Sequence, residues 1–418
     1  MSNVSEDKLI VHYDRAFKAK FIESLEEVID KIDGFEIRFE IEELKDSVFD
    51  DPTDSIDGGY VVLSIDPDDE IDVYYSPLEF GSDLVLKQSD VITLLHDLNN
   101  AELIDYKEYF SKTMYLHRVS ITSKHDESYL KLLMLVTQVD DVEVYLSPEP
   151  SFHFSYLLSQ QGHREPVDHD SFVVIKGSEL TLDRCRQIYK SFIFEANSVS
   201  NAQIESFPNE PFDIDDYLVA APERPAEATT IKRKLILCDD TEKVIDLYNK
   251  AMCCDDDEVA VLFYSKILEF VSETVVRVKV TDEARKALSS NRAMDPDANF
   301  IKELQNLFKD HSYQKDADSI KLTVQTCGYF KDLEDKVPSY IKKKIVTESK
   351  KKEWDALGYI ADSITATRNS IAHAKANYRP SGKEIPEAQY NELAELLRIL
   401  AQQCIRWYAA QSPLIRVK

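Results

Sequence analysis

The feature that most constrains the fold is a change in the period of the apolar residues along the chain. In residues 354–378, WDALGYIADSITATRNSIAHAKANY, the apolar side chains Leu357, Ile360, Ile364 and Ile371 recur at helical spacing. This stripe predicts a helix that is buried against neighbouring helices. In residues 35–41, FEIRFEI, apolar and charged side chains alternate, which predicts a strand with one buried face. The chain therefore combines a strand-rich N-terminal half with a helical C-terminal half.

The N-terminal half is predicted to be an α+β domain built on an antiparallel sheet with helices. A helix is expected over residues 9–32, and further helices over 89–98 and 180–195. Residues 60–65 and 71–75 are expected to form a hairpin around the turn sequence DPDD at 66–69. Further strands are expected at residues 113–121, 129–137, 142–146 and 172–176.

A stretch rich in proline and acid, around residues 205–230, separates the two halves. It carries Pro208, Pro211, Pro222 and Pro225, which interrupt any long element. We therefore expect a first domain over residues 1–205, a linker over 206–234 and a helical bundle over 235–418. Helices of the bundle are expected after Thr241 as a cap, after the acids 255–258, and over residues 296–308, 317–330, 339–352 and 393–407.

Charge is distributed very unevenly. The net charge of the 418 residues is −27, which is unusual for a protein that binds nucleic acid. Residues 1–230 hold 48 acidic and 19 basic residues, a net of −29, whereas residues 231–418 hold 29 and 31, a net of +2. Basic residues surround the 354–378 helix: Lys342, Lys343, Lys344, Lys350, Lys351 and Lys352 before it, and Lys375 and Arg379 near its end. Such a run is either a solvated helix face or a surface that holds an RNA backbone.

Several classes of protein are excluded. The sequence has no apolar run near 18 residues, and its acidic start does not resemble a signal peptide, so a soluble cytoplasmic protein without a membrane segment is expected. The six cysteines form no C-x-x-C pair, which favours reduced thiols. No glycine-rich phosphate loop occurs. The polar residues of GHREPVDHD, at 162–170, follow no firm metal pattern, so a polar loop is favoured, with no metal or cofactor.

Chemistry is concentrated at Arg368, Asn369 and His373. On a regular helix Asn369 and His373 lie on one face, with Arg368 beside them. A histidine transfers protons near neutral pH, and an arginine binds phosphate with a permanently charged fork. These groups suit metal-independent RNA cleavage by the 2′-hydroxyl, with Asn369 orienting the groups. One copy supplies one imidazole, so a twofold dimer is expected. The alternative is a surface arginine with a histidine that caps the helix end.

The sequence RNSIAH at 368–373 resembles the Arg-x4-His motif of the HEPN superfamily. The upstream stretch YSKILEF at 264–270 is similar to the Y-K-x-L-E helix of Apea-type HEPN domains. The resemblance covers residues 235–415 and implies an all-helical HEPN domain. Active members are metal-independent RNases that work as dimers in prokaryotic antiviral defence, including abortive infection and toxin systems. Toxins silenced by tyrosine modification carry a tyrosine two residues after the histidine, where this chain has Lys375.

The resemblance implies a dimeric HEPN endoribonuclease with Arg368, Asn369 and His373 as its catalytic residues. The acidic N-terminal domain is expected to be a sensor or regulatory domain that meets a basic protein partner or a phage-derived trigger. An acidic surface that serves only solubility is the alternative for that domain. A nuclease-inactive HEPN scaffold or adaptor that mediates dimerisation or partner binding is the alternative for the whole chain.

Overall fold

The computed structural model describes most of the chain from residue 84 on and separate short segments before it. The described residues are 9–13, 35–39, 42–43, 61–65, 67–68, 70–75, 84–122, 135–147, 153–154, 157–158, 171–200, 203–206, 229–312, 316–350, 352–372 and 381–417.

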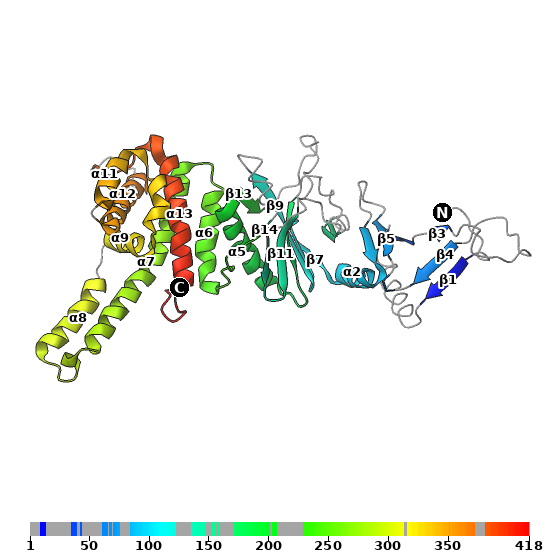
Figure 1. Cartoon of the computed structure of the whole chain (residues 1–418), viewed down its shortest axis with the longest axis horizontal. Helices are drawn as coiled ribbons and strands as arrows, with labels where there is room; N and C mark the ends of the chain where they lie inside the picture. Colours follow the sequence, from blue (N-terminus) through cyan, green and yellow to red (C-terminus); the bar gives the residue numbers. More distant parts are fainter. Residues whose placement is uncertain are drawn as a thin grey trace, which may run out of the picture. The chain divides into compact units, whose positions relative to one another are not determined.

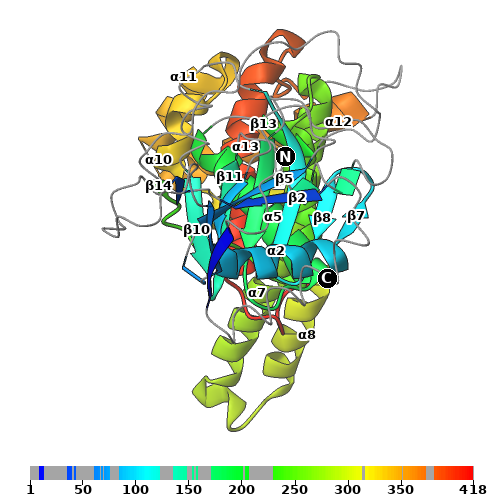
Figure 2. The same ribbon diagram turned by 90° about the vertical axis from the view of Figure 1, so that its right-hand side faces the viewer.

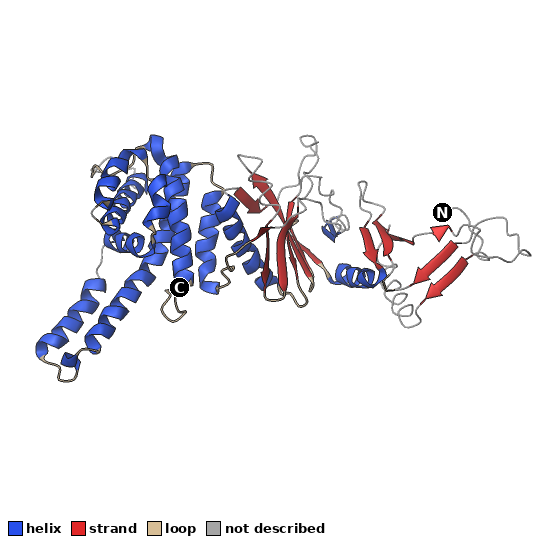
Figure 3. Cartoon of the chain, viewed as in Figure 1, coloured by secondary structure: helices blue, strands red, loops and turns tan. Residues whose placement is uncertain are grey.

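The chain divides into two compact units. One comprises residues 1–120, 133–185 and 206–230, and the other comprises 121–132, 186–205 and 231–418. Every described strand precedes residue 231, and the described residues after it form helices and loops (Figure 3). The structure therefore confirms an α+β N-terminal region followed by an all-helical region. Residues 186–205, which the sequence placed in the first domain, belong to the helical unit.

The largest sheet has the strand order β14-β10-β11-β12-β9-β8-β7, and β13 pairs with β9 beside this path. Its strands are β7 (Glu102–Ile104), β8 (Glu108–Phe110), β9 (Met114–Thr122), β10 (Leu135–Val139), β11 (Val142–Ser147), β12 (Ser171–Lys176), β13 (Gln203–Ser206) and β14 (Thr229–Thr230). The pairs from β10 through to β7 are antiparallel, whereas β14 runs parallel to β10. Residues 171–175 of β12 are all buried, so both faces of the sheet are covered at its centre.

Two small sheets at the start of the chain correct two expectations. Their strands are β1 (Leu9–Tyr13), β4 (Val61–Ile65) and β3 (Glu42–Glu43) in one, and β2 (Phe35–Phe39), β5 (Glu70–Tyr75) and β6 (Leu84–Lys87) in the other. Residues 9–13 are a strand parallel to β4 and not the start of a helix, because a short apolar run fits either element and the pairing partner decides. The hairpin of residues 60–75 is also wrong, since β4 and β5 belong to different sheets. Residues 14–32 lie outside the described residues.

Two long helices accompany these strands. They are α2 (Gln88–Asn100) and α5 (Leu182–Ser200), and both confirm helices expected from the sequence. Within the helical unit, the ring of Phe194 on α5 packs edge-on against Tyr248, with centroids 4.9 Å apart. Arg406 donates to the buried carboxylate of Glu195, with Nη2 3.0 Å from Oε2. These contacts explain why the second part of α5 belongs with the helices.

The helical unit contains eight further α-helices among the described residues, most of which are labelled in Figure 1. They are α6 (Glu242–Met252), α7 (Asp257–Leu288), α8 (Ala298–Ser312), α9 (Asp316–Cys327), α11 (Ser339–Ser349), α12 (Glu353–Ala372) and α13 (Tyr390–Ala409), with the single turn α10 (Phe330–Leu333) between α9 and α11. Short 3-10 turns lie at η3 (Asp239–Thr241), η4 (Asn291–Ala293), η5 (Glu334–Lys336) and η6 (Glu387–Gln389).

Apolar stripes place α12 and α13 in the core, as the sequence predicted. On α12 the side chains of Leu357, Ile360 and Ile364 are buried, and on α13 those of Leu393 and Leu400 are buried. The apolar pattern of the sequence placed Val259, Leu262, Phe263, Ile267, Phe270 and Val271 on one face of α7, and this prediction was only partly right. Ile267 and Val271 are buried, but Val259 is 36% exposed, and Val261, Tyr264, Leu268 and Val275 are buried as well. The reason is that α6, α9, α12 and α13 contact α7 from several sides, so no single stripe faces a core.

The two expected helix starts have different outcomes. The Asp256 carboxylate caps α7 by accepting from the backbone N–H groups of Glu258 and Val259, at 2.8 and 3.3 Å. Thr241 does not cap α6. Its backbone is already helical, and its hydroxyl donates to the carbonyl oxygen of Cys238 at 2.6 Å. A 3-10 turn therefore leads into α6 in place of a side-chain cap.

The second half of α7 and the antiparallel α8 lie side by side and project from the other helices of their unit in both Figure 1 and Figure 2. The tip is closed by Arg292, whose guanidinium pairs with Asp297 and Glu303. Phe300 is the buried apolar side chain of α8 among its described positions, whereas Ile301 and Phe308 are exposed. This arm is thus held by local contacts.

We predict that Gly328→Ala destabilises the helical unit. A Cβ at Gly328 would lie 2.5 Å from the carbonyl oxygen of Val324 and 3.2 Å from Leu357, so backbone and core would have to move. The expected loss is about 1–3 kcal/mol in the free energy of unfolding, measured by denaturant unfolding with far-UV circular dichroism. Gly358→Ala is the matched control, because its nearest neighbours are the movable ends of Gln325 and Lys321. Equal stability of the two variants would contradict this account.

Candidate functional site

The last turns of α12 hold the arginine and asparagine that the sequence singled out. Burial of Ile360, Ile364 and Thr367 fixes the orientation of the helix, and Arg368 and Asn369 follow on its partly exposed side. The helix ends at Ala372, directly before His373. The structure therefore fixes two of the three expected catalytic residues, while His373 lies outside the described residues.

Arg368 makes an ion pair with Glu269 of α7, with Nη2 2.5 Å from Oε1. Its other terminal nitrogen, Nη1, donates to the side-chain oxygen of Asn369 at 3.0 Å. The side chains of Arg368 and Glu269 are 28% and 31% exposed, so the pair is open to solvent on one side. A guanidinium has five N–H donors, and these two contacts leave donors that can reach a ligand.

The ion pair joins the two motifs that carried the resemblance, 99 positions apart in the chain. Within the 264–270 stretch, Tyr264 and Leu268 are buried in the core, and burial raises the pKa of the Tyr264 hydroxyl well above its usual value. Lys266 is exposed beside the ring of Phe263. Glu269 alone in this stretch is linked to Arg368. Sequence reasoning noticed Glu269 but not its partner, because the pairing depends on how α7 and α12 pack.

The segment after the motif returns to α12 beside Arg368. The backbone N–H of Ile385 donates to the hydroxyl oxygen of Thr367 at 2.9 Å, and that hydroxyl donates to the carbonyl oxygen of Ser363 at 2.8 Å. Both Thr367 and Ile385 are buried. This hydrogen bond fixes Ile385 against Thr367, the residue before Arg368.

The basic residues expected to hold RNA divide into two sets. Five of them are described, and all five are exposed: Lys342, Lys343 and Lys344 on α11, and Lys350 and Lys352 beyond its end. Lys344 pairs with Glu348 at 2.9 Å, which raises the pKa of Lys344. The other three, Lys351, Lys375 and Arg379, lie outside the described residues.

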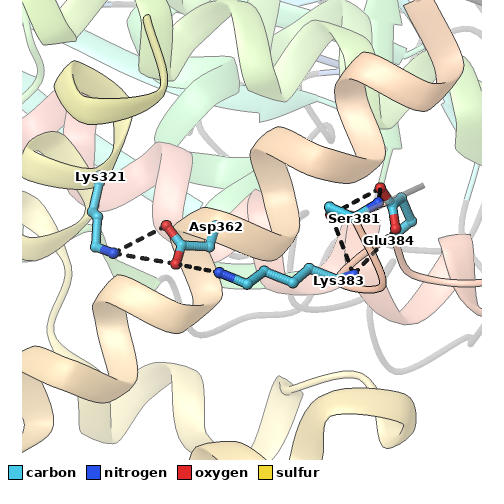
Figure 4. Close-up of polar contacts among 5 residues, drawn as sticks. All are labelled: Lys321, Asp362, Ser381, Lys383 and Glu384. Atoms are coloured by element: carbon cyan, nitrogen blue, oxygen red, sulfur yellow. Dashed lines mark hydrogen bonds and ion pairs between the residues drawn. The ribbon is translucent and has the colours of Figure 1, made fainter. Parts of the chain in front are cut away.

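A second polar cluster on α12 escaped sequence reasoning (Figure 4). The carboxylate of Asp362 accepts from the Lys321 ammonium of α9, at 3.1 and 3.2 Å, and from the Lys383 ammonium, at 2.9 Å. The Lys383 nitrogen also lies 5.6 Å from the ring centroid of Tyr359. The sequence feature that could have pointed to this cluster is the position of Asp362. It precedes Asn369 by seven residues and so lies two turns away on the same face of the helix.

A metal site is not assembled within the described residues. They contain no group of three or more His, Cys, Asp and Glu side chains arranged to hold a metal ion, and residues 162–170 lie outside them. All six cysteines are described and none is in a disulfide. In the described part of the chain, no helix has the length and apolar character needed to cross a bilayer.

Comparisons of this chain with models of protein families, with curated proteins and with solved structures found no match.

We predict that Arg368 and Glu269 are energetically coupled. A double-mutant cycle of Arg368→Ala and Glu269→Ala is expected to give a coupling of about 1 kcal/mol or more in the free energy of unfolding, because either single change leaves a partly buried charge without its partner. The exposed pair Arg285 and Asp282 on the same helix is the control, with an expected coupling below about 0.5 kcal/mol. Coupling no larger than in the control pair would show that Glu269 does not hold the arginine.

Proposed function

We propose that the chain is a metal-independent endoribonuclease of the HEPN type, acting by attack of the RNA 2′-hydroxyl on the adjacent phosphate. The observation that carries the proposal is the ion pair between Arg368 and Glu269. It brings the end of the 264–270 stretch to the arginine of the 368–373 motif. The two motifs that carry the resemblance are therefore in contact in the folded chain.

The chemistry assigns one role to each residue. His373 transfers a proton, either from the attacking 2′-hydroxyl or to the departing 5′-oxygen. Arg368 stabilises the negative charge that develops on the phosphate oxygens. Asn369 orients the guanidinium, to which its side-chain oxygen is bonded at 3.0 Å. The products are a 2′,3′-cyclic phosphate and a free 5′-hydroxyl, and no metal ion enters this scheme.

Two proton transfers require two groups, so the proposed enzyme works as a homodimer in which each copy contributes an imidazole. The RNA substrate is held by the C-terminal half, whose net charge is +2, and Lys342, Lys343, Lys344, Lys350 and Lys352 are exposed there. The half with a net charge of −29 is unsuited to phosphate binding.

We place this activity in the cytoplasm of a prokaryote, as the effector of an antiviral or abortive-infection system. The support is the family analogy together with the two-unit organisation, because an α+β unit of strong negative charge is suited to bind a basic protein or phage-derived trigger. In this scheme the N-terminal unit is a sensor that controls the nuclease.

The ion pair also supports one alternative. A guanidinium neutralised by Glu269 serves equally well to fasten α12 to α7 in a nuclease-inactive scaffold that mediates dimerisation or partner binding. The two functions differ in expression: an active toxin is tolerated by cells only as His373→Ala, whereas a scaffold is tolerated equally in both forms.

We predict that the purified protein cleaves labelled single-stranded RNA or tRNA in EDTA and leaves 2′,3′-cyclic phosphate ends. His373→Ala and Arg368→Ala are each expected to lower the rate by at least about 100-fold, because proton transfer and charge stabilisation contribute effects of this size. The assay is repeated with extract of phage-infected cells to supply a trigger.

The matched controls are His96→Ala on α2 and Arg285→Ala on α7, which remove the same side-chain types from exposed positions and should keep the wild-type rate. Circular dichroism establishes that each variant is folded. Undiminished cleavage by a folded Arg368→Ala variant would remove that residue from the mechanism. Absence of cleavage with and without the extract would favour the scaffold.

A separate prediction concerns the oligomer. Light scattering during gel filtration is expected to give a mass about twice the 48.0 kDa of the chain. Mixing the wild type with excess His373→Ala should lower the cleavage rate per wild-type chain, because most wild-type copies then pair with a copy that lacks the imidazole. A monomeric mass, or a rate unaffected by the mixture, would contradict the shared site.

A further inference from the structure

Two ammonium groups converge on one carboxylate at Asp362, although they come from distant parts of the chain. Lys321 belongs to α9, Asp362 to α12, and Lys383 to the segment between α12 and α13 (Figure 4). Two positive charges against one negative charge leave a net charge of +1. Glu384, next in sequence to Lys383, adds a negative charge to the turn, where its carboxylate accepts from three backbone N–H groups. The two ammonium groups that meet at Asp362 can therefore bind an anion there only in place of the Asp362 carboxylate.

Each lysine is held in place by its surroundings. Lys321 is directed at α12 by its hydrogen bonds to both oxygens of the Asp362 carboxylate, and the glycine at position 358 leaves room for its Cε atom, which lies 2.9 Å from where a Cβ would be. Lys383 sits in a tight turn in which Gly382 has a φ of +79°. The Glu384 carboxylate accepts from the N–H groups of Ser381, Gly382 and Lys383 at 2.7 to 3.1 Å. Both ammonium groups are thus positioned before any ligand arrives, which lowers the entropic cost of binding.

The cluster lies on the same helix as the proposed catalytic residues. Asp362 and Asn369 are seven residues apart, so they occupy one face of α12 with a separation of about 10 Å along its axis. The side chains of Lys321 and Lys383 are 39% and 40% exposed, so a ligand can reach them. An extended RNA strand bound at Arg368 has its neighbouring phosphates within reach of this distance.

We propose that Lys321 and Lys383 bind a backbone phosphate of the RNA strand adjacent to the one that is cleaved, with Asp362 as the counter-ion that this phosphate displaces. The proposal rests on the ribonuclease function proposed above. A phosphate presents several anionic oxygens, as the carboxylate does, and can therefore bridge the same two ammonium groups. The subsite differs from the lysines of α11, which all project from one helix and do not converge on a common point among the described residues.

The alternative is that the three side chains only link α9, α12 and the turn and bind no ligand. In that case Asp362→Asn removes the link, and the affinity for RNA stays the same or falls. In a phosphate subsite, Asp362→Asn removes the competing anion and leaves two positioned cations, so RNA affinity rises. The sign of the change therefore separates the two.

The test is equilibrium binding of a fluorescent single-stranded RNA to the full chain carrying His373→Ala, which prevents cleavage. Asp362→Asn is expected to tighten binding about twofold to fivefold, and Lys321→Met or Lys383→Met to weaken it by a similar factor. In each methionine variant, the decrease of log K with log salt should also be less steep, by about 0.7 in the slope. Lys302→Met, at an exposed position of α8, is the control. Thermal unfolding of each variant shows that it is folded.

The outcomes separate this proposal from the ribonuclease itself. If the wild type cleaves RNA while Asp362→Asn fails to tighten binding, or the methionine variants bind like Lys302→Met, the subsite is wrong and the nuclease stands. If binding follows the predicted pattern while wild type and His373→Ala both fail to cleave, the subsite stands and the catalytic assignment falls. If the wild type neither binds nor cleaves RNA, both are wrong.

Discussion

Burial of the first half of α7 among α6, α9, α12 and α13 is the constraint on which the helical unit depends. Val261, Tyr264, Leu268 and Val271 are each at most 2% exposed, and a fully buried side chain of this kind contributes about 1.5–3 kcal/mol. This packing fixes the rotation of α7 about its axis. As a result Glu269, beside Leu268, is presented to the end of α12.

Two carboxylates then order the cations along α12. Glu269 holds Arg368, and Asp362 holds Lys321 and Lys383. These pairs restrict long side chains that would otherwise sample many rotamers. A polyanion that approaches α12 meets charges already in place, at the cost of displacing or sharing their partners. Positioning, more than binding strength, is what such an arrangement supplies.

An element was predicted correctly where residues close together in the sequence determine its structure, and wrongly where distant segments do. The stripes of α12 and α13 were correct, because each helix packs one face against a core and its period is visible in the sequence. The alternation at residues 35–39 also correctly indicated a strand, β2. Residues 9–13 were assigned wrongly, because five apolar-rich residues carry no period and β4 supplies the hydrogen bonds. The predicted face of α7 was wrong in part, because several helices contact α7 and bury side chains on more than one side of it.

The candidate site shows the same division. Arg368 and Asn369 were identified from their types and spacing, and the structure places them together at the end of α12. The partners Glu269, Lys321 and Lys383 were not connected to the site by sequence. Glu269 and Lys321 lie 41 or more residues before Asp362 in the chain, and Lys383 comes after residues 373–380. Only the packing of α7, α9 and the 381–385 segment on α12 brings these side chains near the site.

The sequence by itself determined the two-part character of this protein. Period, charge and composition are properties of neighbouring residues, so they fixed the strand-rich acidic part, the helical part and the Arg368 to His373 motif. The tertiary structure alone decided which carboxylate meets which cation. Ion pairs such as that of Arg368 with Glu269 join residues far apart in the chain, and their formation depends on helix rotations that only the packed core sets.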